Sequence, residues 1–104
     1  MHLIEIFLPL ADNQGQRQPS KLFEQVRHEL TEQYGGLTAF TRSPAKGVWQ
    51  DDGDNRQQDD IVIYEVMSQA LDRGWWSDYK AGLEARFKQK ELVIRVHQVE
   101  IIID

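Results

Sequence analysis

The stretch from Asp59 to Met67, DDIVIYEVM, places the strongest constraint on the fold. β-Branched and aromatic residues run without a break from Ile61 to Tyr64, which is typical of strands, and two acids precede them where a loop would end. Alternate residues of a strand face opposite sides of a sheet, and here both sides are mostly apolar. The stretch therefore predicts a central strand over 61–67 that is covered on both faces. Glu65 is the exception, a carboxylate in the middle of this strand.

Five further elements follow from the spacing of apolar residues and from turn signals. Residues 2–8, 37–42 and 92–99 are predicted strands, with 48–50 and 101–103 as continuations, and the stretches from Ser20 to the Gly35-Gly36 stop and from Asp72 to Lys90 are predicted helices. Ser20 and Asp72 are the expected N-caps, and Asp52-Gly53 indicates a tight turn. On the second helix Trp76 belongs to the apolar stripe, whereas Trp75 diverges from it by about 100°.

The order strand–helix–strand–strand–helix–strand in 104 residues predicts one ferredoxin-like α+β domain over 1–104. We expect a four-stranded antiparallel sheet with both helices on one face and with 2–8 and 61–67 in the centre. The even-numbered residues of three strands are nearly all apolar, and they are assigned to the face that the helices cover. The odd-numbered residues are also largely apolar, and a large exposed apolar patch usually marks an interface. A homodimer that covers this second face is the expected result.

The layout of the whole chain resembles the dimeric α+β barrel group, in which two ferredoxin-like subunits press their open sheet faces together. Locally, three stretches are similar to small bacterial proteins of uncharacterised function: GGLTAF at 35–40, GVW at 47–49 and DIVIYEV at 60–66. The group includes cofactor-independent monooxygenases, muconolactone-type isomerases, haem-dependent members and stress-responsive proteins with no known chemistry. The resemblance implies a homodimer, but no catalytic residue of these families matches a position in this chain.

Charged side chains on the odd-numbered face form the candidate site. Glu5, Glu65, Arg95 and His97 would project from three adjacent strands and Arg42 from the fourth, as candidate ligand-binding residues, with Glu65 and His97 as the catalytic candidates. Desolvation on an apolar wall raises the pKa of a carboxylate, which suits a general base, while a nearby arginine lowers it. The structural interpretation is favoured over this one: Glu5 and Glu65 pair with Arg95 or across a dimer interface and satisfy charges that lie there.

Composition excludes several classes of protein. The chain has 12 basic and 17 acidic residues and lacks a basic stripe, so nucleic acid is not an expected partner. It has no cysteine, which excludes disulfides, thiolate metal sites and thiol catalysis. Its three histidines lack metal-binding spacing, and neither a metal nor a cofactor is expected. The apolar stretch 1–10 contains Glu5, has no basic lead and is too short to span a bilayer, so we expect no membrane contact and a cytoplasmic location.

These observations predict a small, dimeric module that binds a small organic ligand or serves in assembly, without catalysis. The alternative is a cofactor-independent enzyme, monooxygenase- or isomerase-like, in which Glu65 or His97 acts as a base in a cleft on the sheet face.

Overall fold

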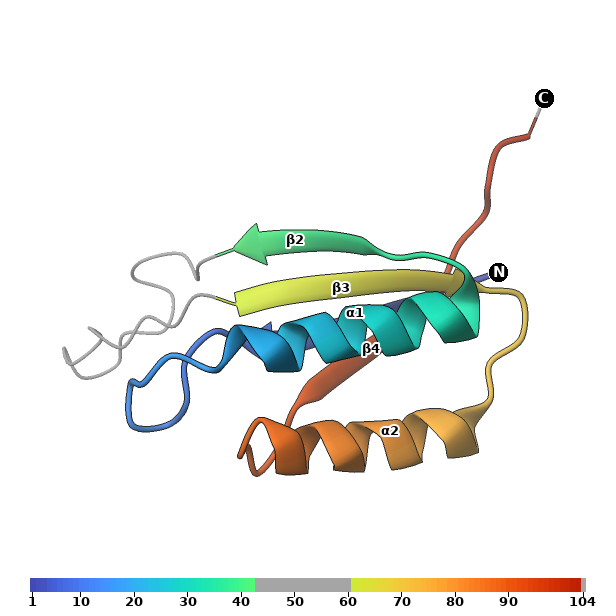
Figure 1. The fold of residues 1–104 in the computed structure, drawn as a ribbon. Helices are drawn as coiled ribbons and strands as arrows, with labels where there is room; N and C mark the ends of the chain where they lie inside the picture. Colours follow the sequence, from blue (N-terminus) through green and yellow to red (C-terminus); the bar gives the residue numbers. More distant parts are fainter. Residues whose placement is uncertain (43–60, 104) are drawn as a thin grey trace, which may run out of the picture.

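The computed structural model describes residues 1–42 and 61–103, and of residues 39–42 it describes the backbone alone. The elements are β1 (His2–Pro9), α1 (Ser20–Tyr34), β2 (Thr38–Arg42), β3 (Ile61–Ser68), α2 (Arg73–Arg86) and β4 (Val93–Gln98) (Figure 1). The chain is thus an α+β protein with two helices and an antiparallel sheet, as the sequence predicts. The expected strand continuation 48–50 and the turn at Asp52-Gly53 lie outside the described residues.

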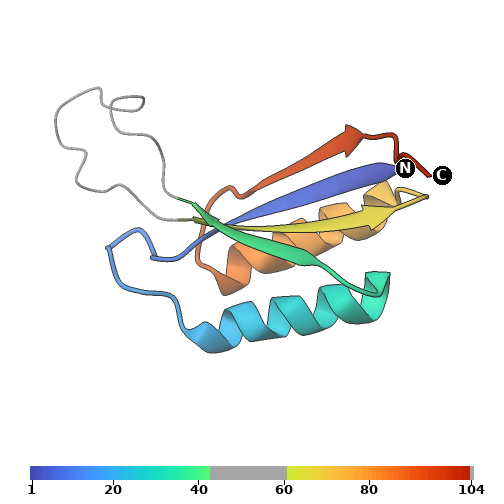
Figure 2. The ribbon, with the colours of Figure 1, turned by 90° about the horizontal axis from the view of Figure 1, so that it is seen from above.

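The sheet is built around β1. This strand pairs antiparallel with β3 on one side and with β4 on the other. The backbone of β2 pairs with the outer edge of β3, so the order is β2-β3-β1-β4. β1 and β3 are therefore the central strands, as expected for 2–8 and 61–67. Both helices lie on one face of the sheet, and they leave the other face open (Figure 2).

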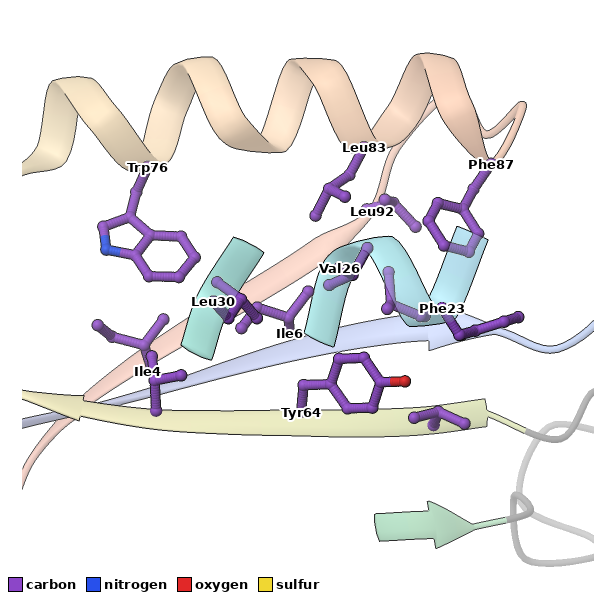
Figure 3. Close-up of a cluster of buried hydrophobic side chains, with 13 residues drawn as sticks. Ile4, Ile6, Phe23, Val26, Leu30, Tyr64, Trp76, Leu83, Phe87 and Leu92 are labelled. Atoms are coloured by element: carbon purple, nitrogen blue, oxygen red, sulfur yellow. The ribbon is translucent and has the colours of Figure 1, made fainter. Parts of the chain in front are cut away.

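The core lies between this sheet and the two helices. The sheet contributes the even-numbered residues of the central strands, Ile4, Ile6, Leu8, Val62, Tyr64 and Val66, and the helices contribute Phe23, Val26, Leu30, Trp76 and Leu83 (Figure 3). The predicted alternation is thus confirmed for β1. In β3 the even-numbered residues are buried as predicted, but Ile63 on the opposite face is buried as well. The alternation weakens in β4, where Ile94 is half-buried and Val96 is exposed, because β4 is an edge strand that the helices cover only in part.

The start of α1 differs from the prediction. Ser20 is the first helical residue, and Pro19 occupies the N-cap position with extended backbone angles and without a side-chain hydrogen bond. A side chain caps a helix from the residue before the first turn, so the hydroxyl of Ser20 is one position too late. The predicted end is confirmed: Gly35 is left-handed, with φ 84°, and its amide donates to the carbonyl of Thr31.

The start of α2 agrees with the prediction and its end does not. The carboxylate of Asp72 accepts a hydrogen bond from the amide of Trp75 at 3.0 Å, which confirms Asp72 as the N-cap. The helix ends at Arg86, four residues before the predicted Lys90. Lys88 has a φ of 55°, a left-handed value that interrupts a helix.

The predicted continuation of the last strand over 101–103 is wrong. β4 ends at Gln98, and the amide of Val99 donates to the carbonyl of Met1 at 3.0 Å. Since β1 itself begins at His2, it offers no further backbone with which 101–103 could pair. The segment runs away from the sheet (Figure 1), and Ile102 is 92% exposed.

A carboxylate joins the two helices. Glu29 of α1 accepts hydrogen bonds from the hydroxyl of Tyr79 at 2.8 Å and from the Nη1 of Arg86 at 2.9 Å, both in α2. Tyr79 is half-buried because its ring packs against the core while its hydroxyl reaches Glu29. In the described part of the chain, neither helix combines the length and the apolar character needed to cross a membrane.

Candidate functional site

Three charged residues form one row across the open face of the sheet. Glu5 of β1 lies directly opposite Glu65 of β3 on one side and opposite Arg95 of β4 on the other. Directly opposed side chains in an antiparallel pair have Cβ atoms about 5 Å apart, so neighbours in this row can interact. We call Glu65, Glu5 and Arg95 the charged row. His97 lies two residues along β4 from Arg95 and contacts the carboxylate of Glu5. The structure thus brings four of the five candidate residues together: Glu5, Glu65, Arg95 and His97.

Glu5 is the centre of the contacts in the charged row. Its Oε1 accepts a hydrogen bond from the Nε2 of His97 at 2.9 Å and lies 3.4 Å from the Nε of Arg95. The side chain of Glu5 is 15% exposed, whereas those of Arg95 and His97 are about half exposed. The guanidinium of Arg95 also lies over the ring of Phe7, 4.6 Å from its centroid, a favourable cation–π arrangement. The carboxylate of Glu5 is therefore already satisfied within one chain.

The two glutamates of the charged row have pKa values shifted in opposite directions. Burial alone would raise the pKa of Glu5, but the hydrogen bonds with His97 and Glu65 and the charges of Arg95 and His97 together lower it. Burial raises the pKa of Glu65, and the hydrogen bond with Glu5 and the negative charge of Glu5 raise it further. Of two neighbouring carboxyl groups, the one without a cationic partner of its own has the higher pKa. In this pair that group is Glu65.

Glu65 does not pair with Arg95 within the chain, which corrects the structural interpretation of this residue. Arg95 forms its ion pair with Glu5, not with Glu65, because β1 lies between β3 and β4 and separates Glu65 from Arg95 by two strand spacings, about 10 Å. The side chain of Arg42 lies outside the described residues. Its backbone pairs with Ile61 at the far end of β2, four residues from the partner of Glu65, which is about 13 Å along the strand.

A hollow of about 290 Å³ opens beside Glu65, between β3 and the connection from α1 to β2. Leu3, Leu37 and Met67 supply apolar lining, and Thr38 and Glu65 supply polar groups. Sequence patterns alone do not predict this hollow, because it forms between segments that are distant in the chain. The Gly35-Gly36 pair, a helix stop in the sequence, also forms part of the hollow's lining.

This arrangement can accept, hold or release a proton at Glu65, on the wall of the hollow, while Glu5 is occupied by Arg95 and His97. Within residues 1–42 and 61–103, no group of three or more histidine, cysteine, aspartate or glutamate residues lies close enough to hold a metal ion.

Comparison with known proteins yields no relative: no family model, no curated protein and no solved structure matches this chain.

Proposed function

We propose that this chain is a homodimeric module of ferredoxin-like fold that binds a small organic ligand without catalysis. Two copies would pair their open sheet faces, as in the dimeric α+β barrels, and the ligand would occupy the hollow beside Glu65. The observation that carries the proposal is the position of Glu65. This carboxyl group has no ion pair within the described residues and lies on the wall of a hollow with both polar and apolar lining.

The pairing of two copies is supported by the apolar character of the open face. Met67 is 49% exposed and Val93 is 50% exposed, and Leu3 and Phe7 lie between them, only partly buried. Apolar patches of this kind on a folded domain usually mark a surface that another molecule covers. Light scattering at micromolar concentration is expected to give about twice the chain mass of 12.2 kDa. A mass of one chain would remove the dimer from the proposal.

The lining of the hollow indicates which ligand it would favour. Leu3, Leu37 and Met67 suit an apolar body, and the carboxylate oxygens of Glu65 suit one hydrogen-bond donor on that body. A hydrogen bond to a charged acceptor contributes about 1.5–3 kcal/mol, which corresponds to a preference of about tenfold or more. The favoured class is therefore a compact molecule with an apolar part and a hydroxyl or amino group.

Cyclohexanol and cyclohexanone test this preference, because they have the same ring and differ in whether the oxygen can donate. We expect cyclohexanol to bind with a dissociation constant in the millimolar range, about tenfold more tightly than cyclohexanone. The measurement is the NMR shift of the backbone amides of Gly35, Gly36 and Met67 during titration. In Glu65→Met, which keeps the side-chain length and removes both carboxylate oxygens, the preference should disappear.

The matched control for this titration is Glu24→Met, on the exposed surface of α1, where the same exchange should leave the preference unchanged. The binding proposal is wrong if neither compound shifts these amides. It is also wrong if Glu65→Met retains the preference for cyclohexanol.

One observation favours the enzymatic alternative, namely the raised pKa of Glu65 beside a hollow that a substrate could enter. A carboxylate of this kind would remove a proton next to a carbonyl group. Proton-for-deuterium exchange at the carbons next to the carbonyl of cyclohexanone, followed by NMR in deuterated water, separates the two functions. Our proposal predicts the same exchange rate with wild-type protein and with Glu65→Met, and a faster rate with wild type would assign Glu65 as a base.

A further inference from the structure

The charged row has a negative end and a positive end. Glu65 lies on β3, Arg95 lies on β4, and Glu5 between them is satisfied by Arg95 and His97. Building on the proposed homodimer, we propose that the two open faces pack with a two-fold axis that runs along β1, so that Glu65 of each copy binds the partner's Arg95. The site on the sheet face is then completed by the second copy, which supplies a cation to one carboxylate oxygen of Glu65 and leaves the other oxygen for the ligand. Within residues 1–42 and 61–103, Glu65 has no ion pair of its own.

The direction of the axis follows from charge complementarity. Two facing sheets keep their strands roughly aligned, and a two-fold axis between them can run along the strands or across them. An axis along β1 exchanges the two ends of each row, which brings Glu65 opposite the partner's Arg95. An axis across the strands, through the charged row, would bring Glu65 opposite the partner's Glu65 and Arg95 opposite the partner's Arg95. Like charges placed face to face cost several kcal/mol, so the charges select the axis along β1.

The neighbouring rows of the open face are apolar except at His97, and Ile63 in them is already buried within the chain. Phe7 lies between Ile63 and Val93, so the row on one side of the charged row is wholly apolar. On the other side, Leu3 lies between Met67 and His97. An axis along β1 places the apolar row on the partner's apolar row. It also places Met67 against the partner's His97, whereas an axis across the strands would place Val93 against it. His97 therefore meets an apolar side chain with either axis, and the charged row alone selects the axis along β1.

The lateral position of the axis is fixed as well. Midway between β1 and β3, the axis would bring Glu65 opposite the partner's Glu5, which is a second carboxylate. Midway between β1 and β4, it would carry Glu65 beyond the edge of the partner's β4. Of these three positions, the axis along β1 is the one that brings Glu65 opposite a cation, the partner's Arg95. Glu5 then faces the partner's Glu5, but each of the two is already paired with its own Arg95 and His97.

Arg95 is able to make the second contact. Its ion pair with Glu5 uses Nε, and the two terminal nitrogens of a guanidinium can bind another carboxylate. The side chain of Arg95 is 54% exposed on the open face. Sheets that pack face to face lie about 10 Å apart, a gap that a glutamate and an arginine extending toward each other can span.

Charge reversal on separate chains tests this geometry. Glu65→Arg would place a positive charge opposite the partner's Arg95, and Arg95→Glu would place a negative charge opposite the partner's Glu65. Each variant alone is expected to dimerise at least about 100-fold more weakly than wild type. An equimolar mixture of the two is expected to form heterodimers within about tenfold of the wild-type dissociation constant, because both contacts are then attractive. Sedimentation equilibrium gives these constants.

A mixture of Glu65→Arg with wild type distinguishes the two axis directions. Our geometry predicts weaker association than in wild type, because one of the two contacts then joins two positive charges. Tighter association than in wild type would overturn the axis along β1 in favour of the axis across the strands. Glu24→Arg and Arg73→Glu, exposed on α1 and α2, are matched controls for net charge and should leave the constant unchanged. Circular dichroism checks that each variant is folded.

A milder substitution keeps the proposal testable if Arg95→Glu does not fold. Arg95→Lys retains the positive charge and adds an amine that a carbodiimide can couple to a nearby carboxylate as an amide. We expect a covalent dimer in which peptide mass spectrometry joins position 95 to Glu65, and its loss when Glu65→Gln is added. A dimeric protein in which position 95 is never joined to Glu65 would contradict this geometry. A monomeric wild type would instead contradict the proposed homodimer, so the two failures are distinguishable.

Discussion

Replacing Trp76 with alanine is expected to lower the free energy of unfolding by about 3–5 kcal/mol. Trp76 is 6% exposed, and its ring points from α2 into the core, where Ile4 and Leu30 lie close to it (Figure 3). The ring also stacks on that of Tyr34, with centroids 5.5 Å apart. Alanine would lose the transfer free energy of the indole and leave a cavity that the surrounding side chains cannot fill. A urea titration followed by circular dichroism measures the loss.

Trp75→Ala is the internal comparison for this experiment, with an expected cost of about 1–2 kcal/mol. Trp75 is half-buried at the edge of the core, where its ring stacks on Tyr79 at 4.8 Å and meets Trp76 edge-on at 4.9 Å. Its removal therefore loses aromatic contacts at the edge and leaves the centre of the core filled. A cost equal to or larger than that of Trp76→Ala would contradict the helix phase described for α2.

Glu5→Gln is expected to lower stability at neutral pH and Glu65→Gln is not, in protein dilute enough to be monomeric. Glu5→Gln leaves Arg95 and His97 with a neutral amide in place of a carboxylate. Both partners are about half exposed and screened by water, so we expect a loss of about 1 kcal/mol, or about 5 °C in melting temperature. Glu65→Gln removes a negative charge that is repelled by the negative charge of Glu5. The melting temperature should therefore be unchanged or higher. A larger loss for Glu65→Gln than for Glu5→Gln would contradict the assignment.

The pH dependence of stability follows from the same two pKa shifts. The pKa of Glu5 is lowered by folding, so its contribution is complete above about pH 5 and is lost as the pH falls through the folded-state pKa. The pKa of Glu65 is raised, so its contribution is present at low pH and is lost as the pH rises through the folded-state pKa. Relative to wild type, Glu5→Gln should therefore lose less stability on acidification, and Glu65→Gln should lose more. Thermal melts over about pH 3 to 7 measure this difference.

The alternation of apolar residues was sufficient to predict the central strands and the side of the sheet that the helices cover. In a two-layer protein, the buried side of a strand must carry every second residue, which leaves little choice for Ile4, Ile6, Tyr64 and Val66. The same alternation placed Glu5 and Glu65 together on the open face. It could not show which of them binds Arg95, because that depends on the register and on the position of β1 between its two neighbours.

The features that the sequence analysis missed depend on contacts between distant segments. Serine is a common N-cap residue, but the extended backbone of Pro19 makes Pro19 the N-cap and Ser20 the first residue of α1. The isoleucines at 101–103 are typical of a strand, yet a strand needs a partner backbone, and β1 does not extend to meet them. The hollow beside Glu65 arises where the α1–β2 connection passes β3, and neither segment indicates it alone.

The titration of the two carboxyl groups is the most direct test of the account of the sheet face. NMR of the side-chain carboxyl carbons, in dilute monomeric protein, gives a separate pKa for Glu5 and for Glu65. We predict a value for Glu65 above the ordinary glutamate pKa of about 4.3 and a value for Glu5 below it. In Glu5→Gln, the pKa of Glu65 should move back toward the ordinary value, because its neighbour no longer carries a charge. Ordinary values for both glutamates, or the reverse order, would contradict the account.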